Sequence, residues 1–287
     1  MTLFYPDCSN NNGASTQDAI NFLQQLVPQG FSGICHKVSE GNYYEDPYWP
    51  AIQQWCQQHN LPLIGYHDVT ADDAASQART WLANQGGSLA MLDWEDNSGD
   101  LANLIAVVDA FNTAGITAQL GYYAQWYWSE QDGGDLAGLA NALVSSAYPD
   151  GTGYASAIYS NAGGQAGQGW APYGNATPAA WQFTDDANIG AVSVGCNAYL
   201  STDIWVLFGS APTTTLDSST TAELSTAQSN ATTAQRPGSR RRTLTKRGLA
   251  LACVRCRTRR PKPLPNMATA FELVSWAPTY RGQLTAV

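Results

Sequence analysis

Two carboxylates stand at the end of one apolar segment, and their spacing suits acid–base chemistry. Residues 89–95 run Leu-Ala-Met-Leu-Asp-Trp-Glu, which is typical of a strand buried on both faces that ends in acids. Because side chains alternate along a strand, we expect Asp93 and Glu95 to share one face, about 6.5–7 Å apart, and Trp94 to lie on the other. Two carboxyls this close cannot both ionise freely, so one should hold a proton near neutral pH. An acid beside an anion is the arrangement that hydrolyses glycosidic bonds.

The elements that must position these acids alternate between strand and helix along residues 1–146. Apolar segments predict five strands there, at residues 3–8, 33–38, 61–68, 89–95 and 117–124. Helical periodicity follows each strand, at residues 16–26, 47–59, 71–84, 100–114 and 135–143. Beyond residue 146 the helical pattern fades, and three strands are predicted, at residues 144–148, 180–184 and 198–204. Five βα units require a parallel sheet covered on both faces, so the predicted fold is an α/β, irregular TIM-like barrel of five βα units followed by three strands with few helices.

A parallel barrel carries its active site at the carboxyl ends of its strands. The predicted strand ends are rich in acids and aromatic rings, at Asp7, residues 36–40, residues 66–68, Asp93, Glu95, Tyr122, Tyr123, Trp181, Gln182 and Asp203. Solvated acids would be spread over helix faces and loops, whereas these fall on one rim, which indicates a cleft. Since a closed barrel brings its first and last strands together, we expect Asp7 and Asp203 to meet near the acid pair and tune it.

Charge divides the chain into two chemically different parts. Residues 1–211 hold 20 Asp and Glu against 2 Lys and Arg, a net charge of −18, and residues 212–287 hold 3 against 12, a net charge of +9. The 287 residues and 44% apolar content suit one barrel-sized domain plus an extension. We predict a catalytic-type domain at 1–211, a Ser/Thr/Ala-rich linker at 212–235 and a basic, disordered tail at 236–287. The acidic domain should repel nucleic acid.

The basic tail and the cysteines leave alternatives open. The tail is either disordered, which we favour, or an electrostatic anchor for an anionic polymer, and a misread or recombined reading frame would also produce so abrupt a change. Its Cys253-Val-Arg-Cys256 lacks a second pair or a His to complete a zinc site. The six scattered cysteines are expected to be mostly buried thiols, although Cys8 and Cys35 could bridge in an oxidising environment.

Several classes of protein lack their motifs in this chain. The three histidines, His36, His59 and His67, do not fall at a familiar zinc spacing, which argues against a metallopeptidase or amidase. A nucleophilic G-x-S-x-G and a phosphate-binding G-x-x-x-x-G-K-[ST] are both absent from the sequence. We therefore expect no metal and no cofactor. The first residues resemble no signal peptide, and no apolar stretch reaches about 18 residues.

With these residues identified, the first ~209 positions resemble glycoside hydrolase family 25, the muramidases (lysozymes) common among phage endolysins and bacterial cell-wall hydrolases. Motifs similar to those of the family occur in its order: Asp7-Cys8-Ser9, residues 33–41, Asp46-Pro47, Gly65-Tyr66-His67, Leu92-Asp93-Trp94-Glu95, Trp181-Gln182-Phe183 and residues 203–209. The chain departs from the family pattern at Trp205, which replaces an Asn, in the long Gly-rich segment 148–179, and at Cys8 and Cys35.

The resemblance implies hydrolysis of the β-1,4 bond between N-acetylmuramic acid and N-acetylglucosamine in peptidoglycan. It also implies a flattened barrel of five βα units and three further strands, which agrees with the fold predicted from the residues. Glu95 would be the general acid. Asp93 would be the anion that stabilises an oxocarbenium-like centre or orients the 2-acetamido group. Asp7 and Asp203 would complete the catalytic set.

Sugar recognition needs flat side chains beside hydrogen-bonding groups. Aromatic residues near the predicted strand ends are the candidates for substrate binding: Tyr66, Tyr123, Trp126 and Trp181. Lys37 is a rare cation in this acidic part of the chain. It either forms a buried salt bridge with Glu40 or Asp7, which we favour, or contacts a substrate carboxylate.

Two other functions compete with a muramidase. A chitinase-type glycosidase would need a further Asp where Met91 stands. A non-catalytic module would use the aromatic cleft and the basic tail only to hold cell-wall glycan. The expected partners are peptidoglycan glycan strands and, for the tail, an anionic wall polymer. We expect a monomer that acts at the bacterial cell wall and reaches it by secretion or by holin-dependent release.

Overall fold

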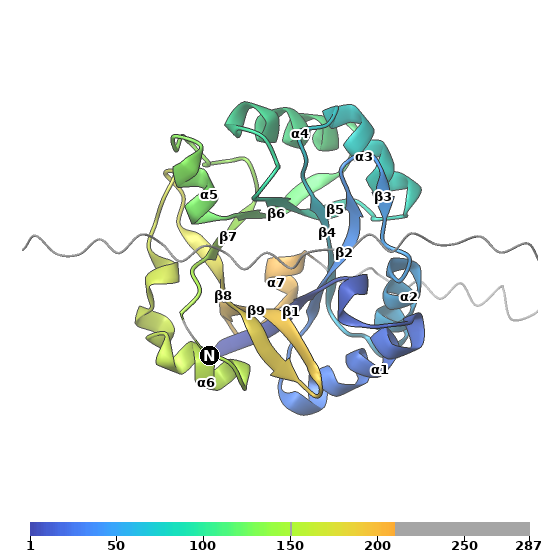
Figure 1. Cartoon of the computed structure of the whole chain (residues 1–287), viewed down its shortest axis with the longest axis vertical. Helices are drawn as coiled ribbons and strands as arrows, with labels where there is room; N and C mark the ends of the chain where they lie inside the picture. Colours follow the sequence, from blue (N-terminus) through green and yellow to red (C-terminus); the bar gives the residue numbers. More distant parts are fainter. Residues whose placement is uncertain (150, 210–287) are drawn as a thin grey trace, which may run out of the picture. The chain divides into compact units, whose positions relative to one another are not determined.

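Eight strands close into a barrel in the computed structural model, which describes residues 1–149 and 151–209 (Figure 1). The strand order is β1-β9-β8-β7-β6-β5-β4-β2, the pairing of β1 with β2 closes the ring, and β3 adds to the edge of β2. The bounds of the strands are β1 (Thr2–Cys8), β2 (Ile34–Glu40), β3 (Tyr44–Glu45), β4 (Leu63–Asp68), β5 (Leu89–Trp94), β6 (Thr117–Tyr123), β7 (Ala142–Ser146), β8 (Pro178–Ile189) and β9 (Val192–Leu200). The predicted α/β barrel is confirmed.

Helices cover the outside of the strands (Figure 1). They are α1 (Thr16–Leu26), α2 (Trp49–His59), α3 (Ala74–Ala83), α4 (Leu101–Thr113), α5 (Gln125–Glu130), α6 (Ala155–Asn161) and the short α7 (Trp205–Phe208). Side chains of Ser15, Asp73 and Asp100 cap α1, α3 and α4 by accepting a backbone N–H three residues on. Each of the first five parallel strands is followed by a helix, so the five predicted βα units are present.

The strands bury their outer face under the helices, and this outer layer holds much of the apolar core. Trp49, Trp81, Trp94 and Trp181 are at most 2% exposed and lie among the buried residues of two apolar clusters. Burying such rings stabilises the fold by about 1.5–3 kcal/mol per large side chain relative to exposure. Because these large apolar side chains are buried under the helices, the inner face of the strands can carry polar side chains at one end of the barrel.

Two predicted elements were wrong. Residues 135–143 form turns and the start of β7 instead of a helix, because Gly133, Gly134 and Gly138 adopt positive φ values of 74°, 120° and 80° that a helix cannot contain. The helix of the fifth unit is α5, which begins directly after β6. The last strand is β9, which begins six residues before the predicted 198–204 and ends at Leu200.

The last strand also runs in an unexpected direction. Strands β1, β2 and β4–β8 are parallel, whereas β9 is antiparallel to both β8 and β1, with Leu200 opposite Thr2. The chain that follows β9 therefore emerges at the amino-terminal ends of the parallel strands, and α7 lies there. Phe208 meets the Tyr5 ring edge-on at 5.1 Å, and the Leu207 carbonyl accepts a 2.8 Å hydrogen bond from Gln119 Nε2. In the view of Figure 1, α7 lies within the ring of strands.

Over the part of the chain that the structure describes, no helix has the length and apolar character needed to cross a membrane. The predicted linker, 212–235, and the predicted disordered tail, 236–287, lie outside the described residues. Those two predictions, and the boundary at residue 211, remain predictions.

Removing the α7 contact should destabilise the barrel. Phe208 is 3% exposed, whereas Val206 on the same helix is 67% exposed. We expect Phe208→Ala to lower the free energy of unfolding by about 3–5 kcal/mol, because it leaves a cavity beneath Tyr5. The matched control, Val206→Ala, should stay within about 0.5 kcal/mol. Equilibrium urea unfolding measures both, and equal effects would show that α7 does not seal the barrel.

Candidate active site

The carboxyl ends of four adjacent parallel strands bring acidic side chains and one lysine together. Strand register places Asp68 beside Asp93 and Lys37 beside Tyr66, while β1, which carries Asp7, pairs with β2. Because paired residues of neighbouring strands share a face, these side chains all project to the barrel interior. Glu95 follows β5 directly, two residues beyond Asp93.

The two acids of the central motif lie on the side opposite Trp94. That indole is fully buried on the outer wall, with ring centroids 6.3 Å from Tyr123 and 5.0 Å from Tyr127. Asp93 and Glu95 are half-buried at the carboxyl ends of the parallel strands. The backbone N–H of Glu95 donates to Ser98 Oγ at 3.0 Å, which fixes the turn that carries it. The predicted opposition of Trp94 to the acid pair is present in the structure.

Lys37 forms ion pairs with two carboxylates. Its Nζ lies 2.5 Å from Glu40 Oε2 and 3.0 Å from Asp68 Oδ2, so the favoured salt bridge to Glu40 is confirmed, while Asp68 takes the place suggested for Asp7. Burial acts to lower the pKa of Lys37, but the two carboxylates outweigh it and the net shift is upward. The ammonium group therefore stays charged and is already paired.

The other carboxyls lack such a partner, and burial keeps them protonated to unusually high pH. Burial and then the neighbouring Glu95 raise the pKa of Asp7 to about 8, and burial and then Asp68 raise that of Glu95 to about 7. Burial and Glu95 also raise the pKa of Asp93, whose Oδ1 is buried without a hydrogen-bond partner among the described residues. Since adjacent buried carboxyls titrate jointly, the raised proton affinity belongs to the Asp93–Glu95 pair.

A chain of hydrogen bonds crosses the same end of the barrel. The hydroxyls of Tyr122 and Tyr148 lie 2.8 Å apart, Tyr148 donates to Gln182 Oε1, and Gln182 Nε2 donates to Asp7 Oδ2 at 3.3 Å. The chain joins β6, the segment after β7, β8 and β1. It leaves Asp7 with a neutral donor only, which is consistent with the high pKa of that carboxyl.

The structure corrects the placement of Asp203. Antiparallel β9 carries the chain away from Asp7, which pairs with Gly195, so Asp203 lies beyond Leu200 at the opposite end of the barrel. There it is exposed, and its Oδ1 accepts the backbone N–H of Trp205 at the start of α7. The expectation that both barrel ends meet at the site was wrong because it assumed a parallel last strand.

Two of the four aromatic candidates also lie elsewhere. Tyr123 and Trp181 are 1% and 0% exposed on the outer wall, where Trp181 Nε1 donates to the Ala147 carbonyl. They belong to the core and do not face the acids. Tyr66 is on the inner face, 5.8 Å from Lys37 Nζ to its ring centroid, and Trp126 is half-buried at the start of α5.

Four residues that lie beside the acids or in the hydrogen-bonded chain that leads to Asp7 are missing from the predicted site residues. Asp68, Tyr122 and Gln182 were placed at strand ends but not among the candidate site residues, and Tyr148 was not singled out. The signal that could have found the first three is their position on the same rim as Asp93. Tyr148 lies in a loop, and only the folded chain shows its contact with Gln182.

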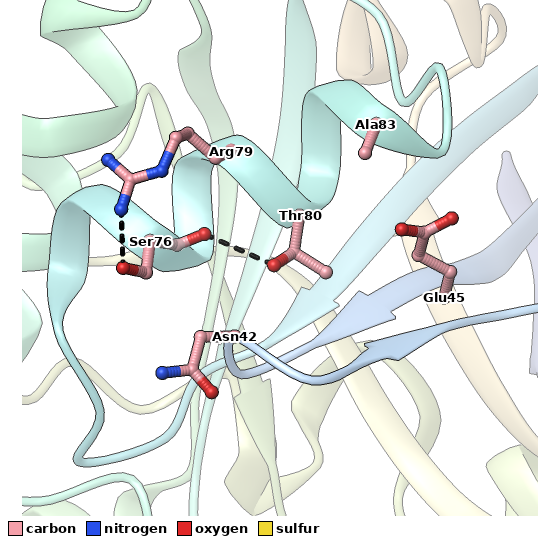
Figure 2. Close-up of a pocket in the computed structure, with 6 residues that line it drawn as sticks. All are labelled: Asn42, Glu45, Ser76, Arg79, Thr80 and Ala83. Atoms are coloured by element: carbon pink, nitrogen blue, oxygen red, sulfur yellow. Dashed lines mark hydrogen bonds between the residues drawn. The ribbon is translucent and has the colours of Figure 1, made fainter.

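A surface hollow of about 400 Å³ lies apart from the carboxyl cluster, between α3 and the turn that joins β2 to β3. Figure 2 shows its lining residues, among which Arg79 donates to Ser76 Oγ at 2.6 Å. None of the candidate site residues lines it. Within the described residues no group of three or more His, Cys, Asp and Glu is arranged to hold a metal ion, and Cys8, Cys35, Cys56 and Cys196 are free thiols.

No family model matches this chain, and no curated protein matches it. Solved structures do match its fold. A family GH25 lysozyme from Aspergillus fumigatus aligns with a TM-score of 0.52 at 18% identity, over 74% of this chain and 100% of the other. The bacterial lysozyme of Streptomyces coelicolor aligns at 0.54 and 18% identity, over 71% and 95%. A glycosyl hydrolase 25 of Streptococcus pneumoniae aligns at 0.56 and 15% identity, over 73% and 94%. At such low sequence identity, these structural alignments show a shared fold and nothing beyond it.

The raised pKa of Glu95 predicts a pH-dependent stability. A carboxyl whose pKa is about 7 folded and near 4.5 unfolded stabilises the fold most below pH 4.5, and this contribution is lost as pH rises towards 7. Glu95→Gln removes the ionisation. We therefore expect its free energy of unfolding, relative to the wild type, to rise between pH 4.5 and pH 8 by on the order of 1 kcal/mol, after allowance for partial exposure.

Urea unfolding at several pH values measures this difference. Glu130→Gln is the matched control, since Glu130 is exposed at the end of α5. Its difference from the wild type should stay constant with pH. A constant difference for Glu95→Gln as well would show that the Glu95 carboxyl is not held in an environment that favours its proton.

Proposed function

We propose that the chain is a peptidoglycan muramidase, which hydrolyses the β-1,4 bond between N-acetylmuramic acid and N-acetylglucosamine. The observation that carries the proposal is the half-buried Asp93–Glu95 pair on a barrel of the lysozyme fold, with burial favouring the protonated form. The family motifs around Asp7, Asp93 and Glu95 support the same function. The substrate would be the glycan strand of the bacterial cell wall.

In this reaction Glu95 is the proton donor. Its pKa of about 7 keeps a proton available at neutral pH, and its place beyond the end of β5 leaves it half-buried at the carboxyl ends of the strands. Asp93 and Glu95 share a proton. When the glycosidic oxygen of the substrate accepts a hydrogen bond from Glu95, the proton resides on Glu95 and Asp93 is the anion. Asp93 then stabilises the developing positive charge or orients the 2-acetamido group.

Asp7 and Lys37 support this pair without sharing its role. Asp7 faces the same interior, and its carboxylate, where it is ionised, raises the pKa of Asp93. Lys37 lowers the pKa of both members of the pair. Because Glu40 and Asp68 already hold its ammonium group, we assign it to setting the pKa of the acids and not to binding substrate. Asp203, at the other end of the barrel, has no part in the proposed reaction.

The proton donor can be tested by removing it. We expect Glu95→Gln to lower kcat for release of reducing ends from purified peptidoglycan by at least about 100-fold, because general acid catalysis contributes 10²–10⁴-fold. Wild-type activity should fall as pH rises above about 7, where Glu95 loses its proton. Glu130→Gln should retain wild-type activity.

Mass spectrometry of the digested glycan then identifies the new reducing sugar. N-acetylmuramic acid at the reducing end supports the muramidase. A different reducing sugar would identify another glycosidase. Tight binding of peptidoglycan with no reducing ends released by the wild type would instead identify a non-catalytic glycan-binding module.

Trp126 remains the aromatic candidate for sugar stacking. It follows β6 directly on α5 and keeps part of its ring exposed. An aromatic contact contributes about 0.5–1.5 kcal/mol, so Trp126→Ala should raise KM roughly three- to tenfold with little change in kcat. Trp55→Ala is the control, since Trp55 is also half-buried but stacks on His59 at the far end of α2. An unchanged KM for Trp126→Ala would remove it from the binding surface.

A further inference from the structure

One irregularity in β2, between Lys37 and Ser39, determines which way Glu40 points relative to Lys37. Lys37 pairs with Tyr66 and Glu40 pairs with Asp68, so three residues of β2 span two residues of β4. In a regular strand, residues three apart face opposite sides. The extra residue forms a bulge that re-aims the side chains beyond it. Lys37 and Glu40 therefore both face the interior, where they form their ion pair.

A hydrogen-bonded chain on the outer wall holds this bulge. Ser39 Oγ lies 2.8 Å from His67 Nδ1, and His67 Nε2 lies 3.0 Å from Gln77 Oε1. Gln77 Oε1 also accepts the Thr70 N–H, and Gln77 Nε2 donates to the carbonyls of Thr70 and Asp72. Because Gln77 Oε1 is thus an acceptor, His67 must donate from Nε2 and accept the Ser39 hydroxyl at Nδ1.

The bulge residue Val38 is fixed separately. Its carbonyl accepts hydrogen bonds from the Asp46 N–H at 2.9 Å and from Asn84 Nδ2 at 2.7 Å. Its side chain lies over Gly65, where an added Cβ would come within 2.4 Å of Val38 Cγ2. These contacts hold the backbone of Val38, and the next residue, Ser39, pairs with His67 and bonds to its ring.

Ser39, His67 and Gln77 are 0% exposed, so they cannot touch a substrate. Burial lowers the pKa of His67 to about 4, which leaves the imidazole neutral over the range in which Glu95 titrates. The three side chains form a fully satisfied polar chain in a layer that also holds large apolar side chains such as Trp81 and Phe111. Apolar residues would fill that space without the risk of an unpaired polar group, so the chain calls for a positional explanation.

We propose that Ser39, His67 and Gln77 are positioning residues of the acid site, which act by holding the β2 bulge so that Lys37 stays beside Asp68 and Glu40. The proposal rests on the proposed function, since the group that Lys37 tunes is the proposed proton donor. Lys37 and Arg79 are the only Lys and Arg among the described residues, and Arg79 is on the outer surface. Within residues 1–149 and 151–209, Lys37 is thus the only Lys or Arg that pairs with carboxyls of this cluster.

A displaced lysine would change the proton affinity of Glu95 in one direction. The charged and titratable groups around Glu95 come from six places in the barrel. They are Asp7 on β1, Lys37 and Glu40 on β2, Asp68 on β4, Asp93 and Asp96 around β5, Tyr122 on β6 and Tyr148 after β7. Among these, only Lys37 favours the anion by its charge. If the bulge relaxes, Glu40 turns away and Lys37 loses one of the two carboxylates that hold it. Once Lys37 moves away from the cluster, the pKa of Glu95 rises.

A matched pair of variants at His67 separates positioning from simple loss of packing. Asn keeps an acceptor near the Nδ1 position and can hold the Ser39 hydroxyl, whereas Gln keeps a group near Nε2 and loses that bond. We expect His67→Gln and Ser39→Ala to lower kcat about tenfold, the lower end of what supporting residues contribute, with KM changed less than about twofold. The alkaline limb of the pH–rate profile should move to higher pH.

His67→Asn should stay closer to the wild type in both respects. Ser145→Ala is the control for losing a buried serine, since Ser145 is 1% exposed on β7 and bonds only to the Gly169 carbonyl. It should leave the alkaline limb in place. Thermal unfolding identifies which variants are folded, and only folded variants are compared.

The decisive measurement is a double-variant comparison. In a Lys37→Met background Ser39→Ala should cause no further shift, because the lysine through which the bulge acts is absent. An equal shift in both backgrounds, or equal effects of His67→Gln and His67→Asn, would overturn the proposal. A carboxyl ¹³C NMR titration of Glu95 gives the same shift without activity, so a protein that fails to cleave glycan would refute the proposed function and still test the positioning.

Discussion

One buried ammonium group faces a larger number of carboxyl groups, and the chemistry of the site follows from that imbalance. Lys37 pairs with Glu40 and Asp68, and among the described residues the acids Asp7, Asp93 and Glu95 have no ion-pair partner. A buried carboxylate without a cation is costly, so such a group keeps its proton instead. The same charge deficit that would destabilise an ordinary core thus supplies a proton donor near neutral pH, which a general acid requires.

Strand direction decides which acids take part. The parallel strands β1, β2, β4 and β5 end at the same rim, so residues far apart in sequence meet there. Antiparallel β9 breaks this rule and sends Asp203 to the other end, although β9 lies directly beside β1. The alternation of side chains along each strand then determines which residues face the interior. It turns Trp94, Tyr123 and Trp181 outward and leaves the acids inside.

Most of the barrel could be predicted from the sequence because its signals are local. Apolar runs, helical periodicity and carboxylates after strands gave the first four βα units and the strand of the fifth, whose helix lies before the predicted 135–143. The order Asp93, Trp94, Glu95 gave the shared face of the acid pair. The rest depended on strand register and direction, which are not local. The wrong position of Asp203 came from strand direction, and Asp68 was left out although its strand was correctly placed. The β2 bulge that turns Glu40 towards Lys37 depends on pairing with β4, and no periodicity in residues 34–40 announces it.

The packing at the amino-terminal end of the parallel strands affects the chemistry at their carboxyl ends, where the acids lie. Beneath the acids the interior is filled by apolar and weakly polar side chains such as Tyr5, Cys35 and Met91, each at most 1% exposed, and Phe208 of α7 packs under Tyr5. This filling separates the carboxyls from solvent on that side. Exclusion of water on one side raises the cost of ionising Asp7, Asp93 and Glu95, because fewer dipoles remain to solvate the anions. An apolar plug far from the reacting atoms therefore helps to hold the proton that the site would donate.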